Sequence, residues 1–394
     1  GPQSEIAGPQ PEVGEWPVSS LRVLHVMSCR GWSSDAYWAA QAVHELQRAG
    51  CDAVLCCRAG TEERVVNPAR ALGVKRIETL RLRSGLEPAA DLADIARLIR
   101  WLPQVDVVHV HRGKEHWLAA LANRLSWSPR PLVRTRHIVQ VVRPHRGNRW
   151  LYQTATDLVL TVTDAINRQY VTSGLLPPER VVTLPGGVDT DRFHPRVDGR
   201  AVRAALGFND GAVLLGMVSG LRVMKGHAVV LEAVTALARD GIRPHVLLAG
   251  QGRHQATIRE AILKAGLENQ FTFMGFVPDL PRTMAAMDVG LYVPLESDGM
   301  GRVVFEYLAM ARPLIASRVG IVPEALTNGH DALLVPAGDP EALAVAIRRL
   351  LEDRQLRQDL GAAGRSLVEA RYSGSRLAER LVALYSRLLR TSSR

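Results

Sequence analysis

A chain of 394 residues is long enough for two or three domains, each with its own hydrophobic core. Hydrophobic residues make up 47% of it and charged residues 22%, a balance that fits a folded globular protein and excludes a disordered chain. No apolar run reaches the ~18–20 residues that a transmembrane helix needs, so we expect none. The formal net charge of +10 indicates anionic partners.

Residues 1–20 are expected to form a flexible segment. They are rich in Pro, Gly and Glu and lack the apolar core of a signal peptide. The cysteines show no metal-binding or redox spacing, and we expect them to be buried free thiols in a reducing compartment: Cys29, Cys51, Cys56 and Cys57. The sequence therefore predicts a cytoplasmic location.

Apolar runs and helical periodicity alternate along the first half of the chain. Strands are predicted at 23–27, 53–57, 107–111, 132–135 and 158–162, and helices at 36–49, 89–101, 117–125 and 150–155. Such alternation is typical of a parallel sheet covered by helices on both faces. We therefore expect a doubly wound domain over residues 21–196.

The alternation returns after a bridge rich in Pro, Gly and Arg near residues 194–200. Strands are predicted at 214–218, 245–249, 271–274, 289–293, 313–316 and 333–335, with helices between them. Further helices are predicted at 341–351, 355–370 and 377–389. A second doubly wound domain is expected over 197–372, with residues 373–394 packing back on the first. The fold class is thus α/β, with ligands expected at the carboxyl ends of the strands.

The segment from Asp298 to Met310 carries the strongest signal for a site. Gly299 and Gly301 stand between a predicted strand and a helix, where the backbone can approach a ligand and the helix start offers free N–H groups. Asp298 and Glu306 flank this junction, and a carboxylate suits a diol because it accepts two hydrogen bonds. The pattern indicates an anion beside hydroxyl groups, such as a sugar joined to a diphosphate.

Simpler interpretations of these acids stay open. Asp298 would serve only as the N-cap of a helix beginning near Arg302, and Glu306 would be a solvated acid on the side of that helix. Glu296 is a candidate for a displaced first carboxylate, although it lies two residues too early for the spacing.

A basic loop follows the first strand of the second half. Arg222 and Lys225 lie in the sequence Gly-Leu-Arg-Val-Met-Lys-Gly-His, before a predicted helix. Two cations at this spacing suit a diphosphate and the charge that builds on it as it leaves. Gly226 beside the helix start favours a binding loop over an exposed basic loop.

These motifs resemble those of the retaining GT-B glycosyltransferases of family 4. Asp298 and Glu306 match the family's Glu-x7-Glu signature, with Asp in the first position. The family's usual Arg, five residues before the Lys, is replaced by Gly220, whereas Arg222 fits a Leu-Arg-x-x-Lys-Gly-His variant similar to transferases of bacterial cell-surface polysaccharides. The resemblance covers about residues 21–389 and implies a deep cleft between two Rossmann-like domains, crossed by the C-terminal helix.

The resemblance also implies roles for individual residues. The implied catalytic set is His137, Arg222, Lys225, Asp298 and Glu306, with the two cations on the diphosphate and Glu306 on the ribose. The implied donor-binding residues are Gly250, Gly252, Phe276, Val277, Gly299, Met300, Gly301, Arg302 and Val303. A phosphate or acceptor loop is implied at Gly31, Trp32, Ser33 and Ser34, where the two serines replace the family's Gly-Gly, and Arg134 and Arg136 are assigned to the acceptor side.

The implied activity is that of a retaining, metal-independent glycosyltransferase of the hexosyl or N-acetylhexosaminyl type. It would move a sugar from a nucleotide-diphosphate donor, with a UDP-sugar as the leading candidate. The acceptor would be a glycan, lipid-linked or phosphorylated molecule in envelope polysaccharide or lipopolysaccharide synthesis. A catalytically silent sugar-nucleotide-binding homologue, a sugar phosphorylase and a small-molecule glycosyltransferase stay open as alternatives.

We expect no cofactor and no metal. Asp189-Thr190-Asp191 has the Asp-x-Asp form of metal-dependent transferases but lies in a predicted inter-domain turn. His109 and His111 are expected to be packed or at the edge of the cleft rather than to bind a metal.

The segment 124–149 contains seven arginines and no acid. Two interpretations fit it, a solvated arginine-rich face or a surface for phosphorylated substrates or anionic lipid. Nucleic acid is not expected, because the aromatic residues follow no stacking pattern. We therefore expect a protein that is cytoplasmic or peripheral on the inner face of the cytoplasmic membrane.

Overall fold

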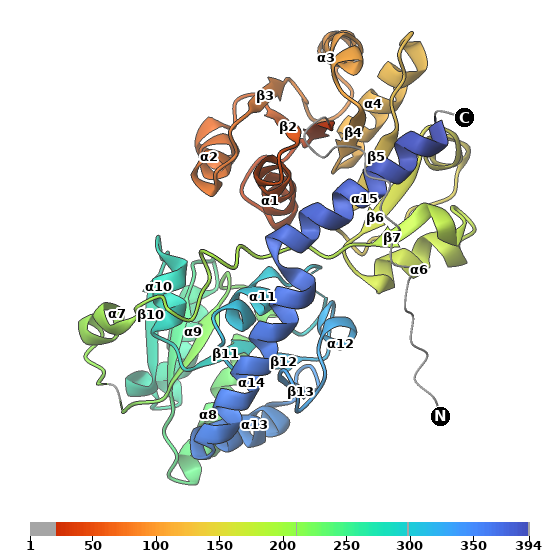
Figure 1. The fold of residues 1–394 in the computed structure, drawn as a ribbon. Helices are drawn as coiled ribbons and strands as arrows, with labels where there is room; N and C mark the ends of the chain where they lie inside the picture. Colours follow the sequence, from red (N-terminus) through yellow and green to blue (C-terminus); the bar gives the residue numbers. More distant parts are fainter. Residues whose placement is uncertain (1–20, 210, 298, 393–394) are drawn as a thin grey trace.

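The structure is a computed structural model that describes residues 21–209, 211–297 and 299–392. It consists of two domains, each built on a parallel sheet, and the last two helices of the chain lie one along the second domain and the other along the first (Figure 1). The expected flexible segment 1–20 and the predicted site residue Asp298 lie outside the described residues.

The first domain holds a seven-stranded sheet in the order β3-β2-β1-β4-β5-β6-β7. Its strands are β1 (Arg22–Val26), β2 (Asp52–Arg58), β3 (Ile77–Leu80), β4 (Val107–Val110), β5 (Leu132–Arg136), β6 (Leu158–Thr161) and β7 (Val181–Thr183). Its helices are α1 (Ser34–Arg48), α2 (Asn67–Leu72), α3 (Pro88–Trp101), α4 (Gly113–Leu125), α5 (Arg146–Arg149) and α6 (Asp164–Thr172). Short helical turns occupy Glu62–Val66, Leu102–Gln104, Trp150–Thr154 and Pro178–Arg180. The inner strands are rich in Val and Leu because helices bury both of their faces.

The second domain holds a six-stranded sheet in the order β10-β9-β8-β11-β12-β13. Its strands are β8 (Leu214–Val218), β9 (His245–Ala249), β10 (Phe271–Gly275), β11 (Val289–Tyr292), β12 (Leu314–Ser317) and β13 (Leu333–Val335). Its helices are α7 (Arg200–Ala205), α8 (His227–Arg239), α9 (Gln255–Lys264), α10 (Leu280–Ala285), α11 (Arg302–Ala309), α12 (Val322–Ala325), α13 (Pro340–Glu352) and α14 (Arg354–Leu367). Short turns lie at Val223–Lys225, Glu268–Gln270 and Val368–Tyr372. Two apolar cores lie in this domain, one rich in residues of α11 and the other in residues of α8 and α13.

Both sheets reverse their strand order beside their first strand, at β1/β4 and at β8/β11. The loops that leave neighbouring strands on opposite faces open a crevice at such a point. The predicted fold class, two doubly wound domains with ligand-binding loops at the carboxyl ends of their strands, is therefore confirmed in its architecture.

The chain crosses between the domains twice, side by side. Residues 184–199 lead out of the first domain, and the amide of Val188 donates to the carbonyl of Tyr372 at 2.8 Å while the amide of Gly374 donates to the carbonyl of Val188 at 2.8 Å. Helix α15 (Gly374–Ser392) then packs against α1, with Leu381 and Tyr385 buried in the core of the first domain (Figure 1). The predicted return of the last helix is confirmed.

Every predicted strand begins and ends within one residue of its predicted bounds. Strands β3 and β7 and helices α2, α6 and α7 were not predicted, and the predicted helix at 150–155 is the turn that continues α5. Within the described ranges, no helix combines the length and the apolar character needed to cross a bilayer.

Candidate active site

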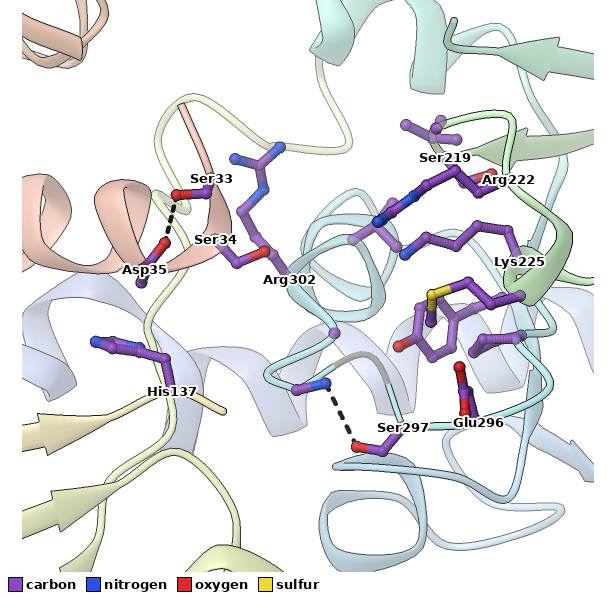
Figure 2. Close-up of a pocket in the computed structure, with 18 of the residues that line it drawn as sticks. Ser33, Ser34, Asp35, His137, Ser219, Arg222, Lys225, Glu296, Ser297 and Arg302 are labelled. Carbon is purple, nitrogen blue, oxygen red and sulfur yellow. Dashed lines mark hydrogen bonds between the residues drawn. The ribbon is translucent and has the colours of Figure 1, made fainter. Parts of the chain in front are cut away.

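A cavity of about 740 Å³ lies between the two domains at the carboxyl ends of their strands (Figure 2). The first domain contributes Trp32, Ser33, Ser34, Asp35, Arg112, His137, Ile138 and Val139. The second contributes residues of the loop after β8, 219–225, and of the segment after β11, 293–303, within the described residues. The cavity therefore joins the two crevices into one site.

Lys225 and Arg222 reach the cavity from the loop after β8 (Figure 2). This loop is held against the neighbouring strand, because the amide of Leu221 donates to the carbonyl of Gln251 at 3.1 Å. Gly226 ends the loop with a φ of +81°, and a Cβ there would lie 2.0 Å from the carbonyl oxygen of Val293. Only glycine fits this position, and the tight turn leaves Lys225 7% exposed and Arg222 at the open rim.

The start of helix α11 forms a second part of the same wall. Gly299 and Gly301 have φ values of +71° and +58°, and Gly301 stands at the N-cap position before Arg302. The interpretation of Asp298 as that N-cap is therefore wrong, since Gly301 holds the place. A helix start offers unpaired backbone N–H groups and the positive end of its dipole, both of which suit an anion.

Glu306 does not line the cavity but lies behind Arg302. The Nε of Arg302 is 3.0 Å from Oε1 of Glu306, and its guanidinium carbon lies 4.3 Å from the ring centre of Tyr37. Glu306 is 1% exposed, and its Oε2 has no hydrogen-bond partner among the described residues. Burial raises the pKa of Glu306, although the charge of Arg302 opposes that rise. The interpretation of Glu306 as a solvated acid is therefore wrong.

An ion pair that was not predicted stands on the wall of the first domain. The Nε of Arg112 donates to Oδ2 of Asp35 at 2.6 Å, and the hydroxyl of Ser33 donates to the other carboxylate oxygen. Burial alone would raise the pKa of Asp35, but these hydrogen bonds and the nearby positive charges hold it well below its usual range. Asp35 therefore stays ionised, and Arg112 adds little net charge to this wall.

His137 follows strand β5 and faces the cavity from the first domain (Figure 2). Its Nε2 lies 3.2 Å from Nδ1 of His111, behind it in the sheet. Burial lowers the pKa of His137 to about 3, so its ring is neutral. A Cβ on Gly299 would lie 3.1 Å from the carbonyl oxygen of His137, so the two domains nearly touch at this point.

The cavity brings together some of the predicted residues: Trp32, Ser33, Ser34, His137, Arg222, Lys225, Gly299, Gly301, Arg302 and Val303. Other predicted residues stand back from the wall: Gly31, Arg134, Arg136, Gly250, Gly252, Phe276, Val277, Met300 and Glu306. Gly250 and Gly252 support the loop after β8, because a Cβ on them would lie 1.9 Å from the carbonyl oxygen of Ser219 and 2.3 Å from that of Leu221. Phe276 is 72% exposed.

Arg134 and Arg136 lie on the face of strand β5 opposite to His137. Arg134 is 3% exposed. The guanidinium of Arg136 donates to the carbonyl of Gln140 at 2.5 Å. Alternation of side chains along a strand accounts for this separation of Arg134 from His137.

The Asp-x-Asp segment is engaged in local contacts. Asp189 accepts hydrogen bonds from the amides of Asp191 and Arg192, both at 3.0 Å, and Asp191 pairs with Arg48 at 2.8 Å. The segment therefore forms the turn that its sequence predicted. Within the described ranges, one group of three potential metal ligands lies close together, buried His25, His109 and His111.

Two family profiles match the chain in succession. The profile described as Glycosyltransferase Family 4 matches residues 37–192, and that described as Glycosyl transferases group 1 matches residues 198–367. D-inositol 3-phosphate glycosyltransferase of Geodermatophilus obscurus is 32% identical over 71% of this chain and 66% of its own length. GDP-mannose-dependent monoacylated alpha-(1-6)-phosphatidylinositol monomannoside mannosyltransferase of Corynebacterium glutamicum is 32% identical over 50% of this chain and 54% of its own length. The matches thus span between about half and two thirds of these two curated relatives.

Solved structures share the fold across both domains. A glycosyltransferase from Rickettsia africae has a TM-score of 0.82 at 19% identity, covering 94% of this chain and 99% of that one. The HepE protein of Anabaena in complex with UDP has a TM-score of 0.77 at 19% identity, covering 93% of this chain and 100% of that one. The two sheets, the cavity between them and the two successive profiles lead to one conclusion: the chain belongs to glycosyltransferase family 4 and has the GT-B fold.

Proposed function

We propose that this protein transfers a sugar from a nucleotide-diphosphate donor to an acceptor hydroxyl, with retention of configuration and without a metal ion. One observation carries the proposal: Lys225, Arg222 and the start of α11 converge on one wall of the inter-domain cavity. A diphosphate placed there meets two cations and the positive end of a helix dipole.

These groups support departure of the diphosphate as well as its binding. Negative charge grows on the phosphate oxygens as the bond to the sugar breaks, and fixed cations stabilise that charge where it develops. The charge of buried Lys225 acts more strongly than that of exposed Arg222, since water screens a charge at the rim more effectively. We therefore assign the larger share of this stabilisation to Lys225.

The reaction that we propose occurs on one face of the sugar. The bond between the anomeric carbon and the phosphate oxygen breaks, the acceptor oxygen bonds to the same face of that carbon, and the acceptor proton passes to the departing diphosphate. Asp35 lines the cavity but is held by Arg112 and Ser33, which makes it a poor nucleophile. By the family resemblance, Asp298 contacts the donor sugar and Glu306 the ribose.

The ribose contact requires a change at Arg302. Glu306 is 1% exposed and lies behind the Arg302 side chain, which itself faces the cavity. Ribose hydroxyls reach the carboxylate only when Arg302 moves aside, and the phosphates of the donor offer its guanidinium a new partner. We propose that donor binding exchanges the Arg302–Glu306 pair for an Arg302–phosphate contact.

A glycan, lipid-linked or phosphorylated acceptor at an anionic membrane surface is the second part of the proposal. Beside His137, the cavity is lined by exposed Ile138 and Val139, and exposed Val141 follows two residues later in the chain. Exposed arginines follow in the same segment: Arg143, Arg146 and Arg149. Apolar side chains next to cations suit the surface of an anionic bilayer. The names of both curated relatives above include a phosphorylated inositol or a phosphatidylinositol.

The donor reaction is tested by incubating the protein with UDP-, GDP- and ADP-sugars and a panel of acceptors, in the presence and absence of a chelator. Mass spectrometry detects the product, and NMR of its anomeric proton reports retention or inversion. We expect chelator-resistant transfer that Lys225→Ala and Glu306→Ala strongly reduce. Full activity in both variants refutes the site.

The same assay separates the alternative functions. Binding of a nucleotide sugar without transfer or hydrolysis identifies a silent homologue, an alternative that the departures from the family pattern at Gly220, Ser33-Ser34 and Asp298 suggest. Dependence on free phosphate identifies a phosphorylase. The membrane part is tested by cosedimentation with vesicles of phosphatidylglycerol and phosphatidylcholine. Binding that salt does not weaken, or that Val141→Ser leaves unchanged, contradicts it.

A further inference from the structure

Six side chains form one hydrogen-bonded series that ends at His137. They come from strands β1, β4 and β5, from the residues that directly follow β4 and β5, and from helix α15. In order they are Thr135, His109, Tyr385, His25, His111 and His137. The five successive distances between their polar atoms are 2.6, 2.6, 3.2, 3.0 and 3.2 Å. The cavity histidine is therefore continuous with a polar series inside the first domain.

The sheet places these groups on one face. His25 and His109 are direct partners in the register of β1 and β4, and alternation brings His111 to the same face as His109. The same alternation brings Thr135 of β5 to one face with His137, which directly follows that strand. The rings of His109 and His111 stack 4.7 Å apart, and Tyr385 reaches the series from α15.

Burial keeps these imidazoles uncharged. It lowers the pKa of His25 to about 3 and holds those of His109 and His111 well below their usual range. A neutral imidazole has one N–H donor and one bare nitrogen that accepts. Each hydrogen bond in the series therefore fixes the next, so that all the ring protons point toward Thr135 or all point toward the cavity.

Thr135 decides between these two arrangements. Its side chain is fully buried. Among the described residues, Nε2 of His109 is the one hydrogen-bond partner of the Thr135 hydroxyl. If that nitrogen carried the proton, the hydroxyl hydrogen would be buried without an acceptor, which is costly. With Thr135 donating instead, every buried donor in the series has an acceptor. The negative charge of Asp35 near His137 favours the same direction.

We propose that this series holds His137 as the tautomer protonated on Nδ1, with Nε2 accepting from His111 and the Nδ1–H directed at the cavity. Tyr385 and His111 are then positioning residues, which act through His137 without touching a substrate. In the reaction proposed above, on which the catalytic role rests, the Nδ1–H donates a hydrogen bond to an oxygen of the donor sugar or the acceptor. The tautomer itself does not depend on that reaction.

A metal ion is the competing occupant of this cluster. The ring nitrogens of His25, His109 and His111 lie within 4.8 Å of one another, and three imidazoles suit zinc. Both nitrogens of each ring are already engaged in the series, however, so the observed pairing favours neutral rings without an ion.

The tautomer is measured on the full chain labelled with 15N in its histidine rings. Long-range 1H–15N spectra distinguish a protonated from a bare ring nitrogen, and His137→Gln identifies the signals of His137. We expect protonated Nδ1 and bare Nε2 in the unaltered protein. A protonated Nε2 at His137, or zinc bound in equal amount to the purified protein, overturns the proposal.

Two variants test the cause. Thr135→Val removes the terminal donor and Tyr385→Phe interrupts the series, so in both we expect the Nε2–H tautomer of His137 to appear. We also expect kcat to fall about tenfold, the equivalent of one hydrogen bond, with the donor KM unchanged. Thr135→Ser restores both readouts. An unchanged Nδ1–H tautomer in folded Thr135→Val refutes the inference, even if Tyr385→Phe does not fold.

Tyr170→Phe is the matched control. Tyr170 is also a buried tyrosine of the first domain, and its hydroxyl lies 3.4 Å from that of Tyr152, outside the series. We expect it to change neither the tautomer nor kcat. If the tautomer follows Thr135 but no sugar transfer is found, the proposed function fails alone. If transfer occurs but the tautomer ignores Thr135, only the present inference fails.

Discussion

The pair of Arg302 and Glu306 makes a quantitative prediction about stability. Glu306 is 1% exposed, while the Arg302 side chain is 31% exposed. Removing one partner of a fully buried pair costs about 3–5 kcal/mol, because the other charge is left without compensation. Water reaches Arg302 and screens part of the interaction, so we expect Arg302→Leu to lower the free energy of unfolding by about 2 kcal/mol.

Glu306→Gln is expected to cost less, about 1 kcal/mol, since the partly exposed guanidinium of Arg302 can turn to solvent. The loss of unfolding free energy in the double variant should be smaller than the sum of the two single losses, by about 1 kcal/mol. In the double variant a neutral amide replaces the carboxylate of Glu306, so Arg302→Leu no longer leaves a buried charge unpaired. Urea unfolding of the four proteins, with the slope checked for constancy, provides these free energies.

The stability deficit of Arg302→Leu should depend on pH, because the pKa of Glu306 is raised in the folded protein. A carboxyl whose pKa is higher in the folded state than in the unfolded state favours folding when protonated, and that advantage is lost as the pH rises from the unfolded value toward the folded one. Arg302→Leu raises the pKa of Glu306 further, so its deficit should shrink as the solution is made acidic. A deficit that is equal at pH values of about 5 and 8, or strict additivity in the double variant, refutes the reasoning.

Three further predictions concern the cavity and the domain contact. Lys225→Ala should lower kcat by a factor of about 100 to 1,000 in the transfer assay, with Lys225→Arg partly active; a loss confined to KM contradicts its role on the leaving group. Gly226→Ala should cost more than about 2 kcal/mol in thermal unfolding, whereas Gly241→Ala, with a similar φ of +80° and open space around it, should cost about 1; equal costs contradict the contact. Glu324→Gln weakens the acceptors for two backbone amides at the start of α6 and should widen the domain separation in small-angle scattering; an unchanged radius of gyration contradicts that role.

The sequence predicts the architecture well because its strands carry a strong local signal. Buried strands of Val and Leu are short apolar runs bounded by glycines and polar loops, and their bounds were found to within one residue. Strand β3 was missed because it lies at the edge of its sheet and alternates with exposed Glu78. Strand β7 has three residues and ends shortly before Pro185, which leaves too little pattern to recognise.

Only some of the contacts in the site join residues that are close together in the sequence. Lys225 and Gly226 lie within one loop, so their spacing in the sequence already indicates their role. Arg112 and Asp35 are far apart in the chain and meet because β4 pairs with β1, which no local pattern specifies. The contact of Arg302 with Glu306 did have a signal, since residues four apart on a helix are neighbours.

The two walls of the cavity differ in charge, and this difference carries a consequence for orientation. Lys225 and Arg222 leave the wall of the second domain positive, whereas on the first domain Arg112 is neutralised by Asp35 and His137 is uncharged. In the reaction that we propose, the diphosphate is therefore attracted to the second domain, and the sugar that it carries is turned toward the first. A neutral N–H donor at His137 suits the uncharged hydroxyls of that sugar, because an imidazolium there would compete with Lys225 for the phosphates. Burial keeps the histidines of the series uncharged. In the proposed reaction it thereby keeps the diphosphate of the donor on the side of the second domain.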